Sequence, residues 1–259
     1  MEKFYLKEKV TFVTGGAGYL GSKVCKALGQ AGAHVVILDS DQIRGKALRS
    51  EMLSELSSAD YEIFDMTRLN RLESQIDKLA CRYGRMDAWV NCSYPRSKDW
   101  YVSVERMKPE SLTKNVDLHL NSYVWTSRLA ALHMSKSKSG TIVNFSSIYG
   151  VQANDFTLYE GTDLVSPLAY SAIKGGIVNA TRYLAAYFGP RGVRVNCICP
   201  GSFENIKNKL FAKRFANKVP LKRLAKPEEA ASVALFLCSE ASSYVTGATI
   251  MVDGGWTIV

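Results

Sequence analysis

The chain has 259 residues, 47% of them hydrophobic and 22% charged, so it can bury a sizeable core and does not have the composition of a disordered protein. Its net charge of +9 is spread along the chain without a basic block, which argues against nucleic-acid binding and favours a basic surface or the attraction of an anionic substrate. No apolar stretch reaches transmembrane length and the N-terminus, MEKFYLKEKV, is charged, so we expect no signal peptide, no membrane partner and a cytoplasmic location.

Short β-branched runs alternate with longer segments that have apolar residues at helical spacing. The predicted strands are residues 10–15, 34–39, 61–66, 88–93, 140–147, 193–201 and 248–255. This alternation is typical of βαβ units and of a parallel sheet that is covered on both faces. We therefore predict a single α/β domain, residues 1–259, built on a doubly wound parallel sheet of about seven strands.

The cysteines are scattered along the chain and lie mostly in apolar segments. That distribution favours buried, reduced thiols over disulfides. Cys197 and Cys199 share one face of a predicted strand, but two ligands do not make a zinc site, and we predict no metal.

A glycine-rich turn, TGGAGYLG, follows the first predicted strand and opens a helical segment. Its glycines leave room for a tight turn and for a pyrophosphate that lies on backbone N–H groups at a helix N-terminus. The turn alone is weak evidence, but its place between strand and helix strengthens it. We expect its contacts with a dinucleotide to come from Gly15, Gly18, Tyr19, Leu20 and Gly21.

The second predicted strand ends at Asp39, 18 residues after Gly21. A carboxylate at this position can accept hydrogen bonds from both ribose hydroxyls and would repel a 2′-phosphate. No arginine follows immediately, because the next residues are Ser40 and Asp41. The pattern therefore favours NAD over NADP, with Asp39 and Ser40 among the cofactor contacts.

Other predicted strands also end in residues that suit this ligand. The carboxyl ends of the strands form the ligand crevice of a doubly wound sheet. Asp65 is expected to meet the adenine amino group with Met66 beside it, and Asn91 to line the wall next to the adenosine ribose. Pro200 and Gly201, at the end of the sixth strand, complete the expected cofactor contacts.

The segment YSAIK places Tyr170 and Lys174 four residues apart at the start of a predicted helix, on one face of it. An ammonium beside a phenol favours the phenolate, so we expect the pKa of Tyr170 to fall from near ~10 toward working pH. Such a tyrosine can exchange the proton that moves when a hydride leaves or reaches a neighbouring carbon. Ser147, at the end of the fifth strand, is expected to hold the substrate oxygen.

Together these features resemble the short-chain dehydrogenase/reductase family along nearly the whole chain. TGGAGYLG, Asp39, the Ser147–Tyr170–Lys174 set, Asn196 in VNCICPG and the closing VTGATIMVDGGW carry the resemblance. It implies a Rossmann-type fold and a nicotinamide cofactor. It also implies that Tyr170 is the acid/base, that Lys174 lowers its pKa and holds the nicotinamide ribose, and that Ser147 orients the substrate.

The chain departs from the family pattern in four places. Tyr19 replaces the middle glycine of the usual turn, and Gly18 gives a spacing closer to that of the extended, sugar-nucleotide-handling branch. The usual NNAG is NCSY at 91–94, and the segment between the serine and the catalytic tyrosine is longer than usual. The asparagine of the family's water-linked proton relay aligns with His119, which either serves that relay or is a packed core histidine.

Two segments are candidates for the substrate site. The long insertion supplies Tyr159, Glu160 and Asp163 as expected substrate contacts, and Arg96 follows the NCSY segment. Residues 202–218 lie where the family usually has a substrate lid, and they form either a solvated basic face or a pocket for an anionic group. The cations of this lid are Lys207, Lys209, Lys213, Arg214 and Lys218.

The leading hypothesis is an NAD-dependent oxidoreductase that acts on a secondary alcohol or ketone of a phosphorylated or nucleotide-linked sugar. The insertion, the NCSYPR segment and the histidine in DLHL also resemble bacterial oxidoreductases of flagellin modification and surface-glycan synthesis. The alternatives are a 3-oxoacyl-carrier-protein reductase, against which Asp39 counts because that chemistry usually takes NADPH, and an NAD-binding regulator that has lost catalysis. The helices after His119 and Tyr170 can pair across a two-fold axis, so we expect a homodimer or homotetramer.

Overall fold

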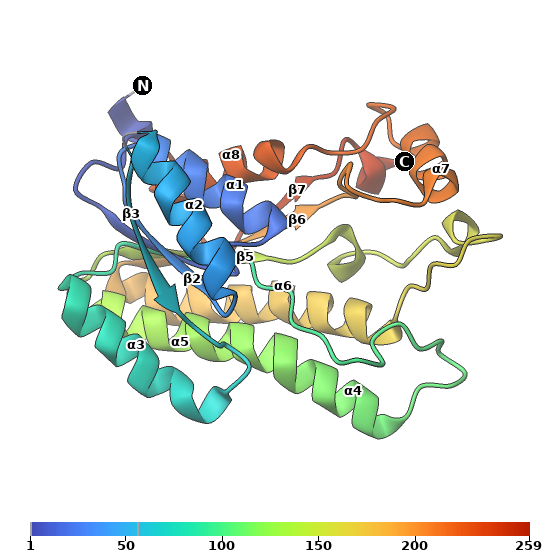
Figure 1. Cartoon of the computed structure of the whole chain (residues 1–259), viewed down its shortest axis with the longest axis horizontal. Helices are drawn as coiled ribbons and strands as arrows, with labels where there is room; N and C mark the ends of the chain where they lie inside the picture. The colour runs from blue at the N-terminus through green and yellow to red at the C-terminus, as the bar shows by residue number, and fades with distance from the viewer. Residues whose placement is uncertain (1, 56) are drawn as a thin grey trace.

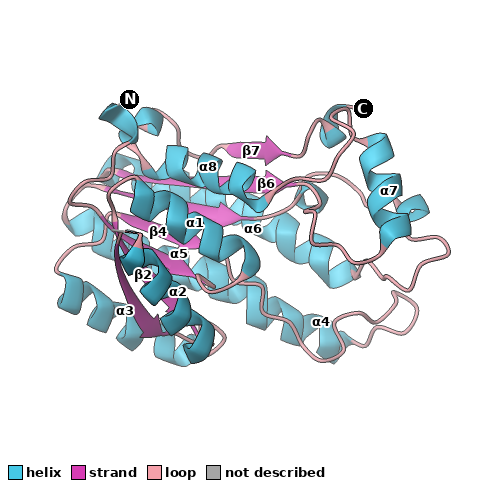
Figure 2. Ribbon diagram, turned by 45° about the horizontal axis from the view of Figure 1, so that its top comes forward, coloured by secondary structure: helices cyan, strands magenta, loops and turns pink. Residues whose placement is uncertain are grey.

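The computed structural model describes residues 2–55 and 57–259; Met1 and Leu56, which the predicted domain includes, lie outside the described residues. The described residues form one parallel sheet of seven strands in the order β3-β2-β1-β4-β5-β6-β7 (Figure 2). The order turns back between β1 and β4, so the predicted doubly wound α/β fold is confirmed. The strands are β1 (Val10–Thr14), β2 (His34–Asp39), β3 (Ser58–Ile63), β4 (Ala88–Asn91), β5 (Gly140–Phe145), β6 (Val193–Pro200) and β7 (Thr249–Val252).

Helices cover both faces of the sheet (Figure 1). Val35 and Ile37 of β2 join the core under α1, α2 and α8, whereas Val36 and Leu38 join the core under α3, α5 and α6, because successive strand side chains point to opposite faces. No helix of the described residues is long and apolar enough to cross a bilayer. The helices are α1 (Tyr19–Gln30), α2 (Gln42–Ser54), α3 (Leu69–Tyr83), α4 (Pro109–Asn115), α5 (Ser122–Lys136), α6 (Leu168–Phe188), α7 (Lys209–Lys218) and α8 (Pro227–Cys238).

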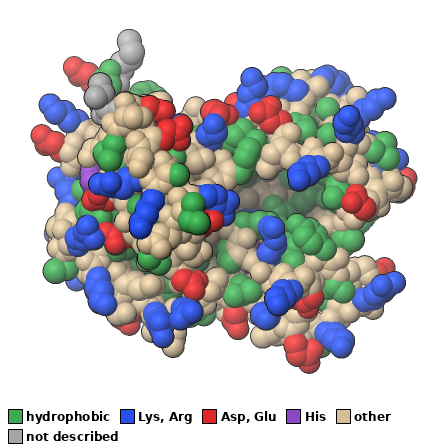
Figure 3. Space-filling view, viewed as in Figure 1, with side chains coloured by type: hydrophobic (Ala, Val, Ile, Leu, Met, Phe, Trp, Pro, Cys, Tyr) green, Lys and Arg blue, Asp and Glu red, His purple; other side chains and the backbone are tan. Residues whose placement is uncertain are grey.

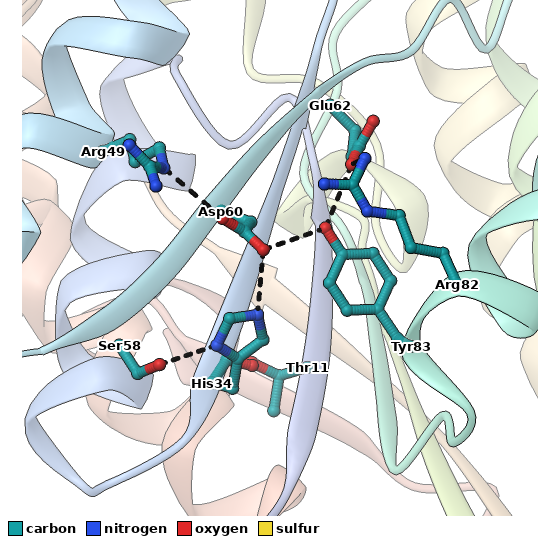
Figure 4. A network of polar contacts seen from close by, with 8 residues as sticks. All are labelled: Thr11, His34, Arg49, Ser58, Asp60, Glu62, Arg82 and Tyr83. Atoms are coloured by element: carbon teal, nitrogen blue, oxygen red, sulfur yellow. Dashed lines mark hydrogen bonds and ion pairs between the residues drawn. The ribbon is translucent and has the colours of Figure 1, made fainter.

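The third strand is shifted from its predicted position. It pairs with β2 over Ser58–Ile63, so the prediction of 61–66 is wrong. Polar contacts at the sheet edge accompany this register: His34 of β2 lies 2.7 Å from the Ser58 hydroxyl, and the Tyr83 hydroxyl donates to Glu62 at 3.0 Å and to Asp60 at 3.3 Å (Figure 4). The apolar pattern of YEIFDM gives no sign of these contacts, which join residues more than twenty positions apart.

The carboxyl edge of the sheet is where the candidate site lies. Five strands end one to three residues before their predicted ends: β1, β4, β5, β6 and β7. The residues that follow these strands therefore form loops over this edge. The space-filling view shows the surface hollowed between the α7 side and the α4 side, with hydrophobic side chains gathered around the hollow (Figure 3). Ligands of open α/β sheets bind at such an edge, next to the reversal of strand order.

Candidate active site

The glycine turn between β1 and α1 keeps its backbone open to a ligand. Gly15 has φ +64°, and a Cβ there would lie 2.7 Å from the Cα of Ser93 in the loop after β4. A Cβ on Gly21 would lie 2.1 Å from the Gly15 carbonyl oxygen. Gly18 is the N-cap of α1, whose first N–H groups are left without an intrahelical partner. The turn therefore offers backbone donors at a helix N-terminus, which suits a pyrophosphate.

Asp39 is held beside this turn by two backbone hydrogen bonds. Its Oδ2 accepts from the Ala17 N–H at 3.0 Å and its Oδ1 accepts from the Asp41 N–H at 2.9 Å. Asp39, Ser40 and Arg44 line the same cavity. The guanidinium of Arg44 is paired with Asp41, with 2.7 Å between Nε and Oδ2. The carboxylate of Asp39 therefore faces the cavity beside a cation that already has an acidic partner.

A long cavity of about 850 Å³ extends from Asp39 to Tyr170 and Lys174. Its volume is within the range of cofactor sites. All of the cofactor contacts predicted from the sequence except Asn91 line it, so the structure brings the glycine turn and the residues at the strand ends together. Asp65 lies in the loop after β3, where its Oδ1 accepts from the Thr67 N–H at 3.0 Å. We refer to this space as the long cavity.

Asn91 lies beneath the long cavity instead of lining it. Its buried side chain accepts from Trp89 Nε1 at 2.9 Å and donates to Asn144 Oδ1 at 2.8 Å and to Ser127 Oγ at 3.0 Å. These bonds tie β4 to β5 and α5. The predicted contact of this side chain with the adenosine ribose is therefore wrong, because a strand-terminal amide satisfied inside the core is not free to face a ligand.

Several residues that line the long cavity were not selected from the sequence. One group of them comes from the loop after β4, which begins with the last three residues of the NCSY segment that departs from the family pattern. The Tyr123 hydroxyl holds this loop by donating to the Ser93 carbonyl oxygen at 2.8 Å. The place of this segment at the end of a predicted strand was the signal available. The additional lining residues include Arg44, Cys92, Ser93, Tyr94, Tyr101, Tyr123 and Phe203.

Lys174 is buried at one end of the long cavity. Its Nζ donates to the Phe145 carbonyl oxygen at 3.0 Å and lies 3.3 Å from Nε2 of His119. Burial lowers the pKa of Lys174 to about 8. Burial, and in second place the charge of Lys174, lower the pKa of His119 well below its usual range, so the imidazole is neutral near pH 7. Because an ammonium only donates, Nε2 of His119 accepts and Nδ1 carries the proton.

His119 is both a packed core residue and a contact of the lysine. It is fully buried in a π-helical segment, Val116–Asn121, that joins α4 to α5. Its ring lies 5.4 Å from that of Tyr94 and 5.1 Å from that of Tyr123, measured between centroids. Its Nδ1 has no hydrogen-bond partner within the described part of the chain. The two interpretations of the sequence are therefore compatible, since packing holds Nε2 against the lysine.

Tyr170, near the start of α6, lies where the long cavity meets a second cavity. Burial raises its pKa to about 12, and a hydrogen bond with Ser147 acts in the opposite direction. The predicted fall in the pKa of Tyr170 is therefore wrong for the protein alone. The ammonium of Lys174, 5.7 Å from the centre of the phenol ring, is directed at His119 and Phe145 instead.

The second cavity, which we call the aromatic chamber, has a volume of about 230 Å³. The rings of Tyr94, Trp100 and Tyr149 stand edge-on around Tyr170, with centroids 6.0, 6.2 and 6.4 Å away. Ser147 also lines the chamber, so the predicted serine and tyrosine meet at one wall. The aromatic lining consists of Tyr94, Trp100, Tyr101, Tyr149, Tyr159, Tyr170, Phe211 and Phe215.

The polar insertion packs against the lid. Arg214 donates to the Glu160 carbonyl oxygen, Asn208 donates to the Asp163 carboxylate at 2.9 Å, and Lys218 pairs with a carboxylate of the insertion. Neither Glu160 nor Asp163 is among the described residues that line the two cavities. A lid side chain therefore occupies the carboxylate of Asp163, whereas the contact at Glu160 involves only its backbone, and the contact of these two residues with a substrate stays a prediction.

The basic lid does not form an anion pocket in the described structure, because none of its five cations lines either cavity. Two of these cations, Arg214 and Lys218, bind the insertion, so the solvated-face interpretation does not describe all five. Of the remaining predicted substrate contacts, Tyr159 lines the aromatic chamber and packs 5.2 Å from the ring of Phe211. Arg96 lines the long cavity, with its guanidinium 5.1 Å from the centre of the Tyr94 ring.

Replacing His119 with leucine is expected to lower kcat by roughly ten- to a hundredfold, because Lys174 loses a hydrogen-bond acceptor in a buried position. Loss of this acceptor is also expected to lower the pKa of Lys174 below about 8. As the pH rises, the ammonium then loses its proton at a lower pH than in the wild type. The alkaline limb of the pH–rate profile for ketone reduction should therefore move to lower pH. His119→Asn keeps an acceptor and is the matched control. A leucine variant with the wild-type kcat and profile would show that His119 only packs.

Comparison with known proteins finds similarity over nearly the whole chain. A family model described as enoyl-(acyl carrier protein) reductase matches residues 16–257. The post-translational flagellin modification protein A of Campylobacter coli is 30% identical over 253 residues, which are 97% of this chain and 99% of that protein. A 3-oxoacyl-(acyl-carrier-protein) reductase of Chlamydia muridarum is 31% identical over 255 residues, 96% of this chain and 98% of that protein. A crystal structure of a gluconate 5-dehydrogenase from Burkholderia cenocepacia, in complex with NADP and tartrate, is 25% identical with a TM-score of 0.89, covering 99% of this chain and 98% of that chain.

Proposed function

Because the chain belongs to the short-chain dehydrogenase/reductase family, we propose that this oxidoreductase uses NAD to transfer a hydride to or from a secondary alcohol or ketone of a sugar derivative. The observation that carries the proposal is the junction of two cavities at Tyr170. One cavity has the volume of a cofactor site and is lined from Asp39 to Lys174, and the other is a small chamber next to the hydroxyls of Ser147 and Tyr170. A cofactor in the long cavity and a small substrate in the aromatic chamber would both contact Tyr170.

The residues of the long cavity fit a dinucleotide. Gly15 and Gly21 leave space that a Cβ would fill, and Asp39 presents a carboxylate at the ribose end. Lys174 lies at the opposite end, where it would hold the nicotinamide ribose. When bound, the nicotinamide supplies or accepts the hydride. The carboxylate of Asp39 supports NAD over NADP because a 2′-phosphate beside it would be repelled.

The proton follows a separate route through this chain's own side chains. In the oxidation direction, the ionised hydroxyl of Tyr170 takes the proton from the substrate hydroxyl while Ser147 holds the same oxygen. In the reduction direction, the protonated Tyr170 returns that proton to the carbonyl oxygen. Lys174 stabilises the phenolate, and His119 keeps the ammonium in place through Nε2. Because the pKa of Tyr170 is raised, oxidation should become faster with rising pH until Lys174, whose pKa is about 8, loses the ammonium that stabilises the phenolate.

A 3-oxoacyl-carrier-protein reductase is the second candidate, and the similarity to the Chlamydia muridarum enzyme favours it. The substrate carbonyl would meet Ser147 and Tyr170 in the same way. Asp39 counts against this candidate, since that reaction usually takes NADPH. Turnover of acetoacetyl-CoA with NADPH, set against turnover of sugar alcohols and ketoses with NAD⁺ or NADH, separates the two. Faster turnover of the thioester with NADPH would overturn the proposed function.

We also propose that the chain assembles through α5 and α6. Trp125 and Leu132 on α5, and Tyr183 and Tyr187 on α6, are large apolar side chains that remain exposed. The rings of Tyr183 and Tyr187 are stacked, 6.3 Å apart. Exposed apolar rows on neighbouring helices are typical of a surface that pairs with a second copy.

A variant with both Tyr183→Glu and Tyr187→Glu is expected to lower the molar mass in solution to that of a smaller assembly, because like charges would face each other across the two-fold axis. Light scattering coupled to size-exclusion chromatography measures this. Ile43→Glu on α2, at a position that is also exposed, is the control and should leave the mass unchanged. An unchanged mass in the double variant would place the interface elsewhere.

A further inference from the structure

The aromatic chamber differs from the long cavity in charge. The long cavity is lined by Asp39, Arg44 and Lys174 among others, whereas no Asp, Glu, Lys or Arg occurs among the described residues that line the chamber. A phosphate, carboxylate or ammonium placed in the chamber would lose hydration without gaining an opposite charge, which is costly. The part of a substrate that enters the chamber is therefore uncharged.

The size of the chamber limits how much of a ligand it can hold. Its volume of about 230 Å³ equals the liquid volume of about eight water molecules. Such a space suits one small ring with its substituents, and it is below the range of typical sites for larger ligands. Aromatic side chains form half of its lining, so they offer flat apolar faces for the C–H surface of a ring.

Two hydrogen-bond donors in the chamber wall lack a partner. Nε1 of Trp100 and the hydroxyl of Tyr149 are buried and make no well-aligned hydrogen bond among residues 2–55 and 57–259, although the hydroxyls of Tyr94 and Tyr159 lie close to them. Trp100 is 2% exposed and Tyr149 is 9% exposed, and both side chains line the chamber beside Tyr170. Burial raises the pKa of Tyr149, so its phenol keeps its proton and remains a donor. Leaving a buried donor unpaired costs about 1–3 kcal/mol, which a bound acceptor would recover.

We propose that the substrate is a neutral, polyhydroxylated single ring, such as an unphosphorylated sugar or a cyclitol. Its ring packs against the aromatic walls, and its oxygens accept hydrogen bonds from Trp100 Nε1 and the Tyr149 hydroxyl. This inference rests on the proposed function, because the ring carries the carbon that exchanges the hydride. A hydrocarbon chain would fill the chamber but leave both donors unpaired. A phosphate ester would bring a charge into a chamber with no charged lining residue, and the guanidinium of Arg96 packs against the Tyr94 and Tyr101 rings on the side of the long cavity.

A matched substrate panel tests this assignment. Neutral hexoses, 6-deoxyhexoses and cyclitols are compared with hexose 6-phosphates, UDP-hexoses and acetoacetyl-CoA, with NAD⁺ or NADH as the cofactor. We expect at least one neutral ring to have a kcat/KM about a hundredfold above that of its phosphate ester, because the uncompensated charge is not accommodated. A preference for a phosphorylated, nucleotide-linked or thioester substrate would overturn the assignment while the proposed hydride transfer stood.

A binding measurement distinguishes failure of this substrate assignment from failure of the proposed function. If no compound is turned over, the proposed function fails, and calorimetric titration of the NADH-loaded protein with the same panel decides the assignment. Saturable binding of a neutral ring, with none by its phosphate ester, supports the assignment. Binding of the phosphate ester alone, or of neither compound, overturns it.

Conservative variants of the two donors give a second test. Trp100→Phe and Tyr149→Phe keep an aromatic ring and remove one donor, and each should raise KM for the neutral ring about tenfold with kcat changed less than about threefold. Trp256→Phe is the matched control. Its Nε1 also lacks a partner among the described residues, and its ring stacks on Phe215, but it does not line the chamber. Wild-type KM values in both donor variants would contradict the proposed contacts.

Discussion

Replacing Tyr170 with phenylalanine is expected to lower kcat by about a hundredfold to ten-thousandfold in both directions, because the substrate oxygen loses the group that exchanges its proton. Phenylalanine keeps the edge-on contacts with Tyr94, Trp100 and Tyr149, so the chamber should keep its shape. Initial rates with NAD⁺ and an identified alcohol, and with NADH and the matching ketone, measure the effect. The affinity for NADH should change less than about threefold.

Tyr244→Phe is the control for this substitution, because it removes the same hydroxyl from a fully exposed side chain outside both cavities. It should leave kcat unchanged. A Tyr170→Phe variant that keeps the wild-type kcat would remove Tyr170 from the proton route. A variant that loses NADH binding as well would show a structural effect, which the unfolding temperature of the two variants would reveal.

Replacing Asp39 with serine is expected to reduce the preference for NADH over NADPH by about a hundredfold or more. Two hydrogen bonds from the ribose hydroxyls lose a charged acceptor, and each is worth about 1.5–3 kcal/mol. A 2′-phosphate also loses its repulsion, and Arg44 already lies in the same part of the cavity. Titration of the protein fluorescence with each reduced cofactor gives both dissociation constants.

Asp39→Asn is the informative companion, because the amide keeps an acceptor oxygen and loses the charge. The preference of this variant for NADH over NADPH should lie between those of the wild type and the serine variant. Asp39 also accepts from the Ala17 N–H, so the unfolding temperature of each variant must be compared. Tighter binding of NADPH than of NADH by the wild-type protein would overturn the proposed role of this carboxylate.

The parts of the site that could be predicted from the sequence depend on local patterns. The glycine turn lies between a strand and a helix, and Tyr170 and Lys174 are four positions apart on one helix. Asp39 ends a strand, and its place at the sheet edge follows from the doubly wound topology. In each case the backbone geometry follows from neighbouring residues, so a short sequence window contains the necessary information.

The parts that could not be predicted depend on contacts between distant segments. Asn91 bonds to Asn144 and Ser127, and the insertion bonds to the lid, so polar residues that looked free for a ligand are already paired. The pKa of Tyr170 depends on burial, which the spacing to Lys174 does not report. Trp100 reaches the chamber from the loop after β4, whose path no periodicity predicts.

Transfer of a label tests hydride transfer most directly. A substrate deuterated at the reacting secondary carbon is incubated with NAD⁺ and the protein, and the reduced cofactor is analysed by mass spectrometry. We predict one deuterium in each NADH formed by the wild type, and loss of this product in proportion to kcat in Tyr170→Phe. NADH that carries no deuterium, or labelled NADH formed by Tyr170→Phe at the wild-type rate, would contradict the proposed mechanism.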